Sequence, residues 1–296
     1  MKNQIGLALG GGGARGSYQI GVLRAFEEAN ILKKIKHVSG TSIGAINALM
    51  VMAKLPYEKM IELWERITNE QIYGSGLDRF KLDRLGLFSL QELYEKLSKE
   101  VSLSEIRESK IQGYATAAKI HKNKLVEQVL IHRMEKEVFH LNNYKDPHKA
   151  VLASASIPLL FGSTGIEEET FVDGGIVDNC PIDPLLEAGC DIIIAVPING
   201  GFHEKDYQNH DILLASIESK KLFSITRIDV LDFKPKDVKQ KAEYGYAMGK
   251  LILSKMKQLG FLDDMGNITR PEGYYYIDIS KEEEKILKHE VTSTWT

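Results

Sequence analysis

Two short apolar segments near the N-terminus each run into glycine and are then followed by a helical pattern. This arrangement constrains the fold most strongly. Residues 5–9 lead into Gly10–Gly16, and residues 36–39 lead into Gly40–Gly44. Short apolar runs of this kind are typical of buried parallel strands. The first 53 residues therefore predict β-loop-α-β-loop-α, the beginning of an open α/β sheet whose sites lie at the carboxyl ends of its strands.

The remaining pattern predicts one α/β domain with helical additions. Residues 57–108 are charged and have helical apolar spacing, which predicts an insertion that covers a sheet face or forms a lid. Ser89 with Glu92, and Ser102 with Glu105, have the spacing of capping boxes. Further elements follow the same reasoning: a first helix over 17–28, a second from about 42, strands over 112–120, 125–131, 191–197, 227–233 and 274–279, and helices over 147–155 and 239–259.

The expected architecture is a three-layer α/β/α fold with a mostly parallel central sheet, occupying residues 1–296 as a single domain. Within it we expect a motif-bearing core over about 5–200, the helical insertion over about 57–110, and a C-terminal extension over about 201–296. The extension carries no motif that indicates a function.

Composition excludes several classes of function. The 296 residues carry a net charge of −3, which provides no global basic field for nucleic acid. Two cysteines, Cys180 and Cys190, cannot form a disulfide framework or a cysteine-rich zinc site, and are expected to be buried small hydrophobes. The sequence shows no secretory signal and no apolar run near the ~20 residues of a membrane span. We therefore expect a cytoplasmic protein that meets lipid from the aqueous side.

The run Gly10–Gly16 places flexible backbone between a strand and a helix, where N–H groups can face an anion. Gly11, Gly13 and Gly16 match the dinucleotide spacing, but the next strand ends in Ser39-Gly40 rather than an acidic residue. A phosphate-binding P-loop requires Lys-Ser/Thr after the last glycine, which is absent. The remaining ligand is the oxyanion that forms when an acyl carbonyl is attacked.

The second junction, Gly40-Thr41-Ser42-Ile43-Gly44, is a G-x-S-x-G sequence between a strand and a helix. Flanking glycines permit the sharp turn that exposes a nucleophilic hydroxyl. The alternative is that Ser42 only caps the helix. A nucleophilic serine needs a base, and Asp173 follows a short β-like run and precedes Gly174 and Gly175. Taken alone, that Asp-Gly pair would indicate only a turn.

Together these motifs resemble the patatin-like phospholipase family. The resemblance covers roughly residues 5–200, in the family's order, and rests on Gly11–Gly16, Gly40–Gly44, Ala153–Pro158, Asp173-Gly174-Gly175, Asn179-Cys180-Pro181 and Gly189-Cys190-Asp191.

The resemblance implies a hydrolase of lipid acyl esters with a Ser–Asp dyad. Ser42 would form the acyl-enzyme, Asp173 would act as the general base, and the N–H groups of Gly11, Gly12 and Gly13 would hold the oxyanion. Arg15 would either tie the loop to a neighbouring group or contact a phosphate. The expected substrate is a phospholipid or lysophospholipid, and no cofactor or metal is implied.

Three alternatives remain open from the sequence. A Ser–His–Asp esterase of the α/β-hydrolase type would use His203, His210 or His289, which all follow Asp173. A degenerate hydrolase would bind lipid without cleaving it. A dinucleotide-binding reductase would use the first glycine loop.

Transient contact with a membrane surface is also expected. Two basic stretches, 33–37 and 234–241, are candidates for attraction to anionic lipid. A third candidate is the apolar set Leu82, Leu85, Leu87 and Phe88, which would enter the interface or close the pocket.

Overall fold

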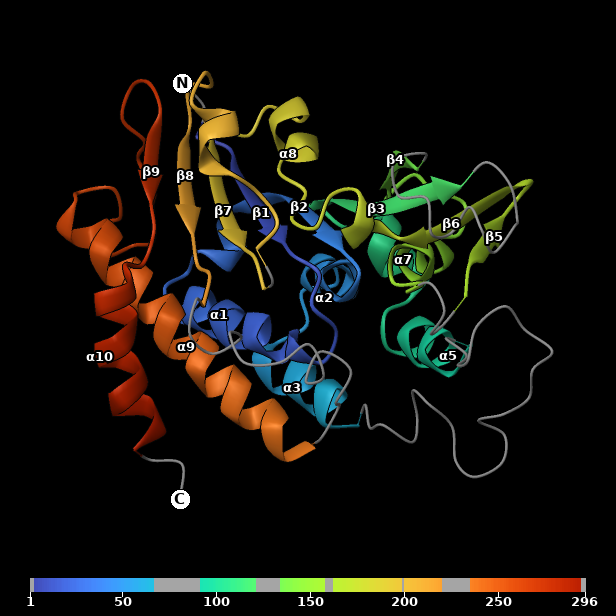
Figure 1. Cartoon of the computed structure of the whole chain (residues 1–296), viewed down its shortest axis with the longest axis horizontal. Helices are drawn as coiled ribbons and strands as arrows, with labels where there is room; N and C mark the ends of the chain where they lie inside the picture. The colour runs from blue at the N-terminus through green and yellow to red at the C-terminus, as the bar shows by residue number, and fades with distance from the viewer. Residues whose placement is uncertain are drawn as a thin grey trace.

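The computed structural model describes residues 3–66, 91–120, 134–157, 162–198, 200–219 and 235–293. Its centre is a mixed, mostly parallel β-sheet with helices on both faces (Figure 1). The described strands are β1 (Ile5–Leu9), β2 (Ile35–Thr41), β3 (Gln112–Ile120), β4 (Glu135–His140), β5 (Thr164–Ile166), β6 (Glu169–Asp173), β7 (Ile192–Val196), β8 (Leu213–Ser216) and β9 (Tyr275–Ile277).

The strand order is β5-β6-β3-β2-β1-β7-β8-β9, with β4 paired to β3 outside this path. Strands β3, β2, β1, β7, β8 and β9 run parallel to one another. Strands β4, β6 and β5 join antiparallel at the β3 side of the sheet. The parallel strands β1 and β7 are buried along their whole lengths, as expected for a sheet covered on both faces.

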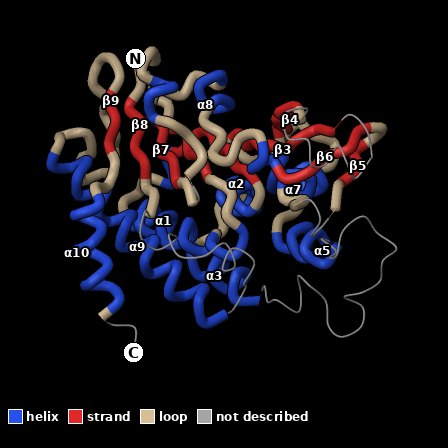
Figure 2. The backbone as a smooth tube through the Cα atoms, viewed as in Figure 1, coloured by secondary structure: helices blue, strands red, loops and turns tan. Residues whose placement is uncertain are grey.

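The helices cover the two faces unequally (Figure 2). The described helices are α1 (Ser17–Glu28), α2 (Ile43–Met52), α3 (Tyr57–Arg66), α5 (Gln91–Glu100), α6 (Leu103–Arg107), α7 (Pro147–Ser154), α8 (Asp183–Glu187), α9 (Pro235–Gln258) and α10 (Lys281–Thr292). One face is covered by a layer in which α9 contacts α1, α3 and α10, and α1 also contacts α3. The short α8 lies on the other face. No helix in the described ranges is both long and apolar enough to cross a membrane.

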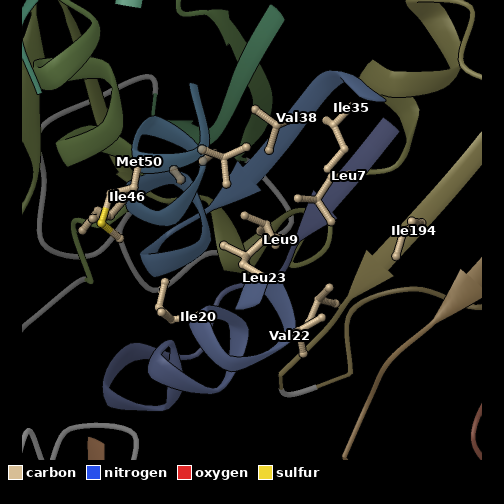
Figure 3. Packing of buried hydrophobic residues seen from close by; sticks show 14 of the residues in the cluster. Leu7, Leu9, Ile20, Val22, Leu23, Ile35, Val38, Ile46, Met50 and Ile194 are labelled. Carbon is tan, nitrogen blue, oxygen red and sulfur yellow. The ribbon is translucent and has the colours of Figure 1, made fainter. Parts of the chain in front are cut away.

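The main hydrophobic core lies between the sheet and this larger helical layer (Figure 3). Alternation along β1 divides its side chains, because Leu7 and Leu9 enter the main core while Ala8 faces the smaller core under α8. Cys180 and Cys190 are free and buried in that smaller core, as the sequence predicted. Burial therefore holds both faces of the central strands away from water.

The C-terminal part of the chain is built into this architecture. It supplies β8 and β9 to the sheet, and α9 packs along the length of α1. A Cβ atom at Gly21 would overlap the carbonyl of Ala242, and one at Gly245 would overlap the carbonyl of Tyr18. The two helix backbones approach so closely that only glycine fits at these positions.

Many of the predicted elements are confirmed. The predicted helix over 17–28 coincides with α1, and the predicted strand over 112–120 coincides with β3. Asp146 caps α7 by accepting a hydrogen bond from the Lys149 N–H at 3.0 Å, with Pro147 in the first turn. Ser102 and Glu105 form the capping box expected for α6.

Several parts of the structure differ from the sequence predictions or add to them. The predicted helix over 239–259 begins earlier, at Pro235. Strands β4, β5 and β8 and helix α10 had not been predicted. The alternating charges of β4, Glu135-Lys136-Glu137, fit an edge strand whose outer face is exposed, and they hide the apolar signal.

Several predictions lie outside the described residues. These are the strands over 125–131 and 227–233, the capping-box residue Ser89, and the apolar set Leu82, Leu85, Leu87 and Phe88.

The close α1–α9 contact predicts that Gly245→Ala will destabilise the protein. Alanine is the better helix former by roughly 1 kcal/mol, but its methyl group would collide with the Tyr18 carbonyl. We expect a net loss of about 2 kcal/mol or more in the free energy of unfolding, measured by urea denaturation. The matched control is Gly165→Ala, because its Cβ would meet nothing closer than 4.0 Å. Equal stability of the two variants would show that α9 does not support the core.

Candidate active site

Strand β3 brings the two predicted catalytic segments together. Strand β2 pairs with it in parallel as far as Thr41 opposite Thr116, and β6 pairs with it antiparallel as far as Asp173 opposite Ala117. Because β4 occupies the other edge of β3 along the same stretch, β2 and β6 must share one edge. Their carboxyl ends therefore meet head to head at adjacent positions of β3. Ser42, the residue after β2, is thereby placed beside the end of β6.

Ser42 occupies a strained turn between β2 and α2. Its φ of 56° and ψ of −125° lie in a region that residues other than glycine rarely adopt. Cβ atoms at Gly40 and Gly44 would overlap backbone, at Gly44 and Leu9 respectively, so both glycines are required by close packing. The Ser42 hydroxyl forms no capping hydrogen bond with α2. The interpretation of Ser42 as a simple helix cap is therefore wrong.

Asp173 has a buried carboxyl group in which one of the two oxygens is available to accept a hydrogen bond. Its side chain is 7% exposed, and Oδ1 accepts a hydrogen bond from the Gly175 N–H at 2.8 Å. Burial raises the pKa of Asp173 to about 6, while the nearby Ser42 hydroxyl and the Gly175 N–H act in the opposite direction. Oδ2 has no hydrogen-bond partner of regular geometry among the described residues. The carboxyl is thus a stronger base than a solvated aspartate and has one oxygen available.

Two serines of the Ala153–Pro158 segment hold the dyad residues in place. Ser154 Oγ accepts from the Ser42 N–H at 2.8 Å and donates to the Thr116 carbonyl at 2.5 Å. The Ser156 carbonyl accepts from the Asp173 N–H at 2.8 Å. Neither serine has a role that is predictable from the sequence. Their only signal was the resemblance of their segment to the family motif.

The glycine loop lies directly beside the nucleophile. A Cβ at Gly11 would lie 3.2 Å from Ser42 Cβ, and 2.5 Å from Asn179 Oδ1. The Gly11 N–H donates to the Asn179 carbonyl at 2.9 Å. Gly11 was expected to share in holding an oxyanion; in this structure its N–H is occupied, so an oxyanion would have to displace the Asn179 carbonyl there. The N–H groups of Gly12 and Gly13 donate to no acceptor in the described part of the chain.

Asn179 links the glycine loop to the Asp173 turn. Its Nδ2 donates to the Gly11 carbonyl at 3.3 Å, and its Oδ1 lies 2.8 Å from where a Cβ of Gly175 would stand. A Cβ at Gly174 would overlap the Thr116 carbonyl on β3. The two glycines after Asp173 thus allow this turn to approach β3 on one side and Asn179 on the other.

Arg15 and Gly16 end the loop at the start of α1. The Arg15 side chain is 4% exposed and is therefore enclosed by protein, which favours a role in tying the loop to its surroundings over contact with a phosphate. A Cβ at Gly16 would lie 2.6 Å from Ile43 and 2.6 Å from the Trp64 ring, so this glycine lets α1, α2 and α3 converge.

The histidines do not take part in this arrangement. Within the described ranges, no histidine hydrogen bonds to Ser42 or Asp173. The buried His148 bonds instead to the Val101 carbonyl at 2.7 Å. His203 lies before a short 3-10 turn and His289 lies at the end of α10. The geometry thus favours a Ser–Asp dyad over a Ser–His–Asp triad.

Comparison with known proteins finds relatives by sequence and neighbours by structure. Lysophospholipase NTE1 of Chaetomium globosum is 29% identical over 198 residues, and lysophospholipase nte1 of Aspergillus niger is 30% identical over 199 residues. Each match covers 66% of this chain but only 12% of the relative. The solved structure of VipD from Legionella pneumophila covers 86% of this chain and 67% of its own, with 14% identity and a TM-score of 0.48.

The family model described as patatin-like phospholipase matches residues 7–186, which is more than half of the chain and includes Ser42, Asp173, the glycine loop and Asn179. The chain belongs to the patatin-like phospholipase family.

Proposed function

We propose that this chain hydrolyses fatty-acyl ester bonds of phospholipids or lysophospholipids, with Ser42 as nucleophile and Asp173 as general base. One observation carries the proposal: a serine on a strained turn lies beside a buried carboxyl whose pKa is raised to about 6 and whose Oδ2 has no hydrogen-bond partner of regular geometry among the described residues. Membership of the patatin-like phospholipase family and relatives named lysophospholipases support the substrate class.

In the acylation step, Asp173 accepts the Ser42 hydroxyl proton while Ser42 Oγ attacks the ester carbonyl. The carbonyl oxygen becomes an oxyanion, which the N–H groups of Gly12 and Gly13 would stabilise. The C–O bond to the alcohol then breaks, and Asp173 returns the proton to the leaving oxygen. A base with a pKa of about 6 suits both proton transfers better than a solvated carboxyl does.

In the deacylation step, Asp173 accepts a proton from water, which attacks the acyl carbonyl on Ser42. The same N–H groups stabilise the second oxyanion. Collapse releases the fatty acid and returns the proton to Ser42 Oγ. One carboxyl thus performs both steps without a histidine, because burial has already raised its basicity.

We expect an alkyl fluorophosphonate to form a single covalent adduct on Ser42, detected by mass spectrometry. Ser42→Ala should form none. Asp173→Asn should react about 10²–10⁴-fold more slowly, since it keeps the shape but removes the general base. An unchanged rate in Asp173→Asn would show that Asp173 is not the general base. Absence of any adduct on the folded wild type would favour the lipid-binding, degenerate hydrolase.

Stability measurements provide the control for this experiment. Because folding raises the pKa of Asp173, the stability linked to this group is present at low pH and is lost as the pH rises through about 6. Asp173→Asn removes the buried charge and should raise the free energy of unfolding at pH 8 by on the order of 2 kcal/mol. A slower but more stable variant excludes unfolding as the cause of lost reactivity.

The labelling rate should depend on pH with an inflection near 6. Below that value Asp173 is protonated and cannot accept the Ser42 proton, so the rate should fall about tenfold per pH unit. Above about pH 7 the rate should be constant. Because an ordinary histidine titrates in the same range, His203→Ala, His210→Ala and His289→Ala are measured in parallel and should retain the wild-type profile. An inflection near 4 would mean that burial does not tune the base.

The two basic stretches expected to meet lipid lie at different distances from the site. Lys34 lies just before β2, and the seven residues of that strand separate it from Ser42 by about 26 Å. Its Nζ is held by the Met265 carbonyl at 2.6 Å and by Asn267 Oδ1 at 2.7 Å. The 33–37 stretch is therefore poorly placed to bring a lipid to the nucleophile.

The start of α9 is better placed, because Lys241 Nζ lies 3.4 Å from the Ala14 carbonyl in the glycine loop. Lys239 is 68% exposed and pairs with Glu65 at 3.0 Å. We propose that this end of α9 faces the lipid surface. Lys239→Gln should weaken flotation with anionic phospholipid vesicles at low salt by about fivefold, whereas Lys33→Gln should not. Equal effects of the two substitutions would contradict this placement.

A further inference from the structure

Three buried side chains from three helices form a hydrogen-bonded network beneath the glycine loop. Gln19 on α1 and Asn47 on α2 are fully buried, and Trp64 on α3 is 1% exposed. Gln19 Nε2 donates to the Gly10 carbonyl at 2.8 Å and to the Val196 carbonyl at 3.0 Å. Buried amides of this kind are costly unless every polar atom has a partner.

Asn47 continues the network toward the other end of the loop. Its Nδ2 donates to the Gly16 carbonyl at 3.1 Å and to Gln19 Oε1 at 2.8 Å. Its Oδ1 accepts from the Trp64 indole N–H at 3.1 Å. Both amides therefore use their two donor hydrogens and their oxygen.

The indole sets the direction of all these bonds. The Trp64 N–H is only a donor, so Asn47 must present its oxygen to α3 and its NH₂ group to the loop. Gln19 must then present its oxygen to Asn47 and its NH₂ group to Gly10 and Val196. An amide flipped at either position would place two donors or two acceptors against each other. One N–H group on α3 thus fixes the polarity of contacts that reach the glycine loop.

The network clamps the glycine loop at both ends. At Gly10 the carbonyl is held by Gln19, and the N–H of the same peptide unit, that of Gly11, is held by the Asn179 carbonyl at 2.9 Å. At Gly16 the carbonyl is held by Asn47. Between these ends lie the unoccupied N–H groups of Gly12 and Gly13. Fixing the flanking peptide planes limits how those two donors can turn.

The clamp also joins the loop to the nucleophile. Asn47 lies on the helix that begins immediately after Ser42, and the Trp64 ring packs against Gly16. The loop and the serine are therefore held in one frame rather than as two separate segments. A displacement of 1 Å between reacting groups is enough to cost about 10²-fold in rate.

We propose that Gln19, Asn47 and Trp64 are positioning residues that set the orientation of the Gly12 and Gly13 N–H groups relative to Ser42. The proposal rests on the proposed function, since it concerns the oxyanion contacts of the same site. It adds residues that neither the sequence motifs nor the family comparison assigns to the reaction. Disruption of the network should lower kcat while leaving KM nearly unchanged, because the oxyanion exists only in the transition state.

The test compares Trp64→Phe and Asn47→Asp with a matched control, Asn142→Asp. Trp64→Phe removes the indole donor and keeps an aromatic ring. Asn47→Asp keeps the shape and the acceptor but loses the NH₂ donors. Asn142 is also a buried amide, 6% exposed, whose Nδ2 donates to the Ile106 and Ile111 carbonyls, outside the site. All three variants lose buried hydrogen bonds and should lose stability to a similar extent.

For a short-chain lysophospholipid we expect both network variants to lower kcat at least about tenfold with KM within about twofold of wild type. Asn142→Asp should retain kcat within about twofold at a temperature where all variants are folded by circular dichroism. A parallel decrease in kcat among all three, or no decrease in the network variants, overturns the proposal. If Asn47→Asp does not fold, Trp64→Phe decides the outcome.

A second readout separates this proposal from the proposed function. In protein labelled with ¹⁵N-glycine, Trp64→Phe should shift the amide signals of the 10–16 loop and speed their hydrogen exchange at least about tenfold, whereas Asn142→Asp should leave them unchanged. This measurement needs no substrate. If the wild type has no esterase activity but Trp64→Phe still shifts the loop signals, the proposed function is refuted and the clamp is retained. Unchanged loop signals in active Trp64→Phe would refute the clamp and retain the function.

Discussion

The shared edge of β3 is the constraint on which the rest of the site depends. A parallel strand and an antiparallel strand approach this edge from opposite ends and stop at neighbouring residues, Thr116 and Ala117. Backbone pairing alone therefore sets Ser42 and Asp173 side by side, although 131 residues separate them along the chain. The Thr116 carbonyl then accepts from Ser154, which in turn accepts from the Ser42 N–H. The register in which β2 and β6 pair with β3 therefore also fixes the position of Ser42.

Burial at this meeting point carries an energetic cost that the surrounding fold must offset. Ser42 holds a backbone conformation that costs about 1–3 kcal/mol, and ionised Asp173 loses solvation on burial. The close packing of α1 against α9, the main core and the satisfied amides of Gln19 and Asn47 lie directly behind the site. A rigid support of this kind keeps the strained residues from relaxing.

Local chemistry explains which parts of this arrangement were predictable from sequence. The turn at Gly40, Ser42 and Gly44 is recognisable from the sequence, because a sharp turn between a strand and a helix needs those residue types. The Gln19–Asn47–Trp64 network was not predictable, since Trp64 fits the apolar stripe of its helix and the two amides acquire partners only through tertiary contacts. The same reason applies to the partner of the Gly11 N–H, a residue 168 positions away along the chain. Strand β4 was not predicted because an edge strand carries charged residues, and its sequence then resembles that of a surface helix or loop.

The distribution of unpaired polar groups ties these observations together. In the described part of the chain, three buried side-chain oxygens have no hydrogen-bond partner: those of Ser17 and Thr116, and Oδ2 of Asp173. All three belong to segments that form the site, at the end of the glycine loop, on β3 and at the end of β6. Natural folds leave few such groups, and each one calls for a reason. Here the amides of Gln19 and Asn47 are fully paired. The free acceptor of Asp173 and the free donors of Gly12 and Gly13 lie where a serine would attack an ester carbonyl and where negative charge would develop on its oxygen.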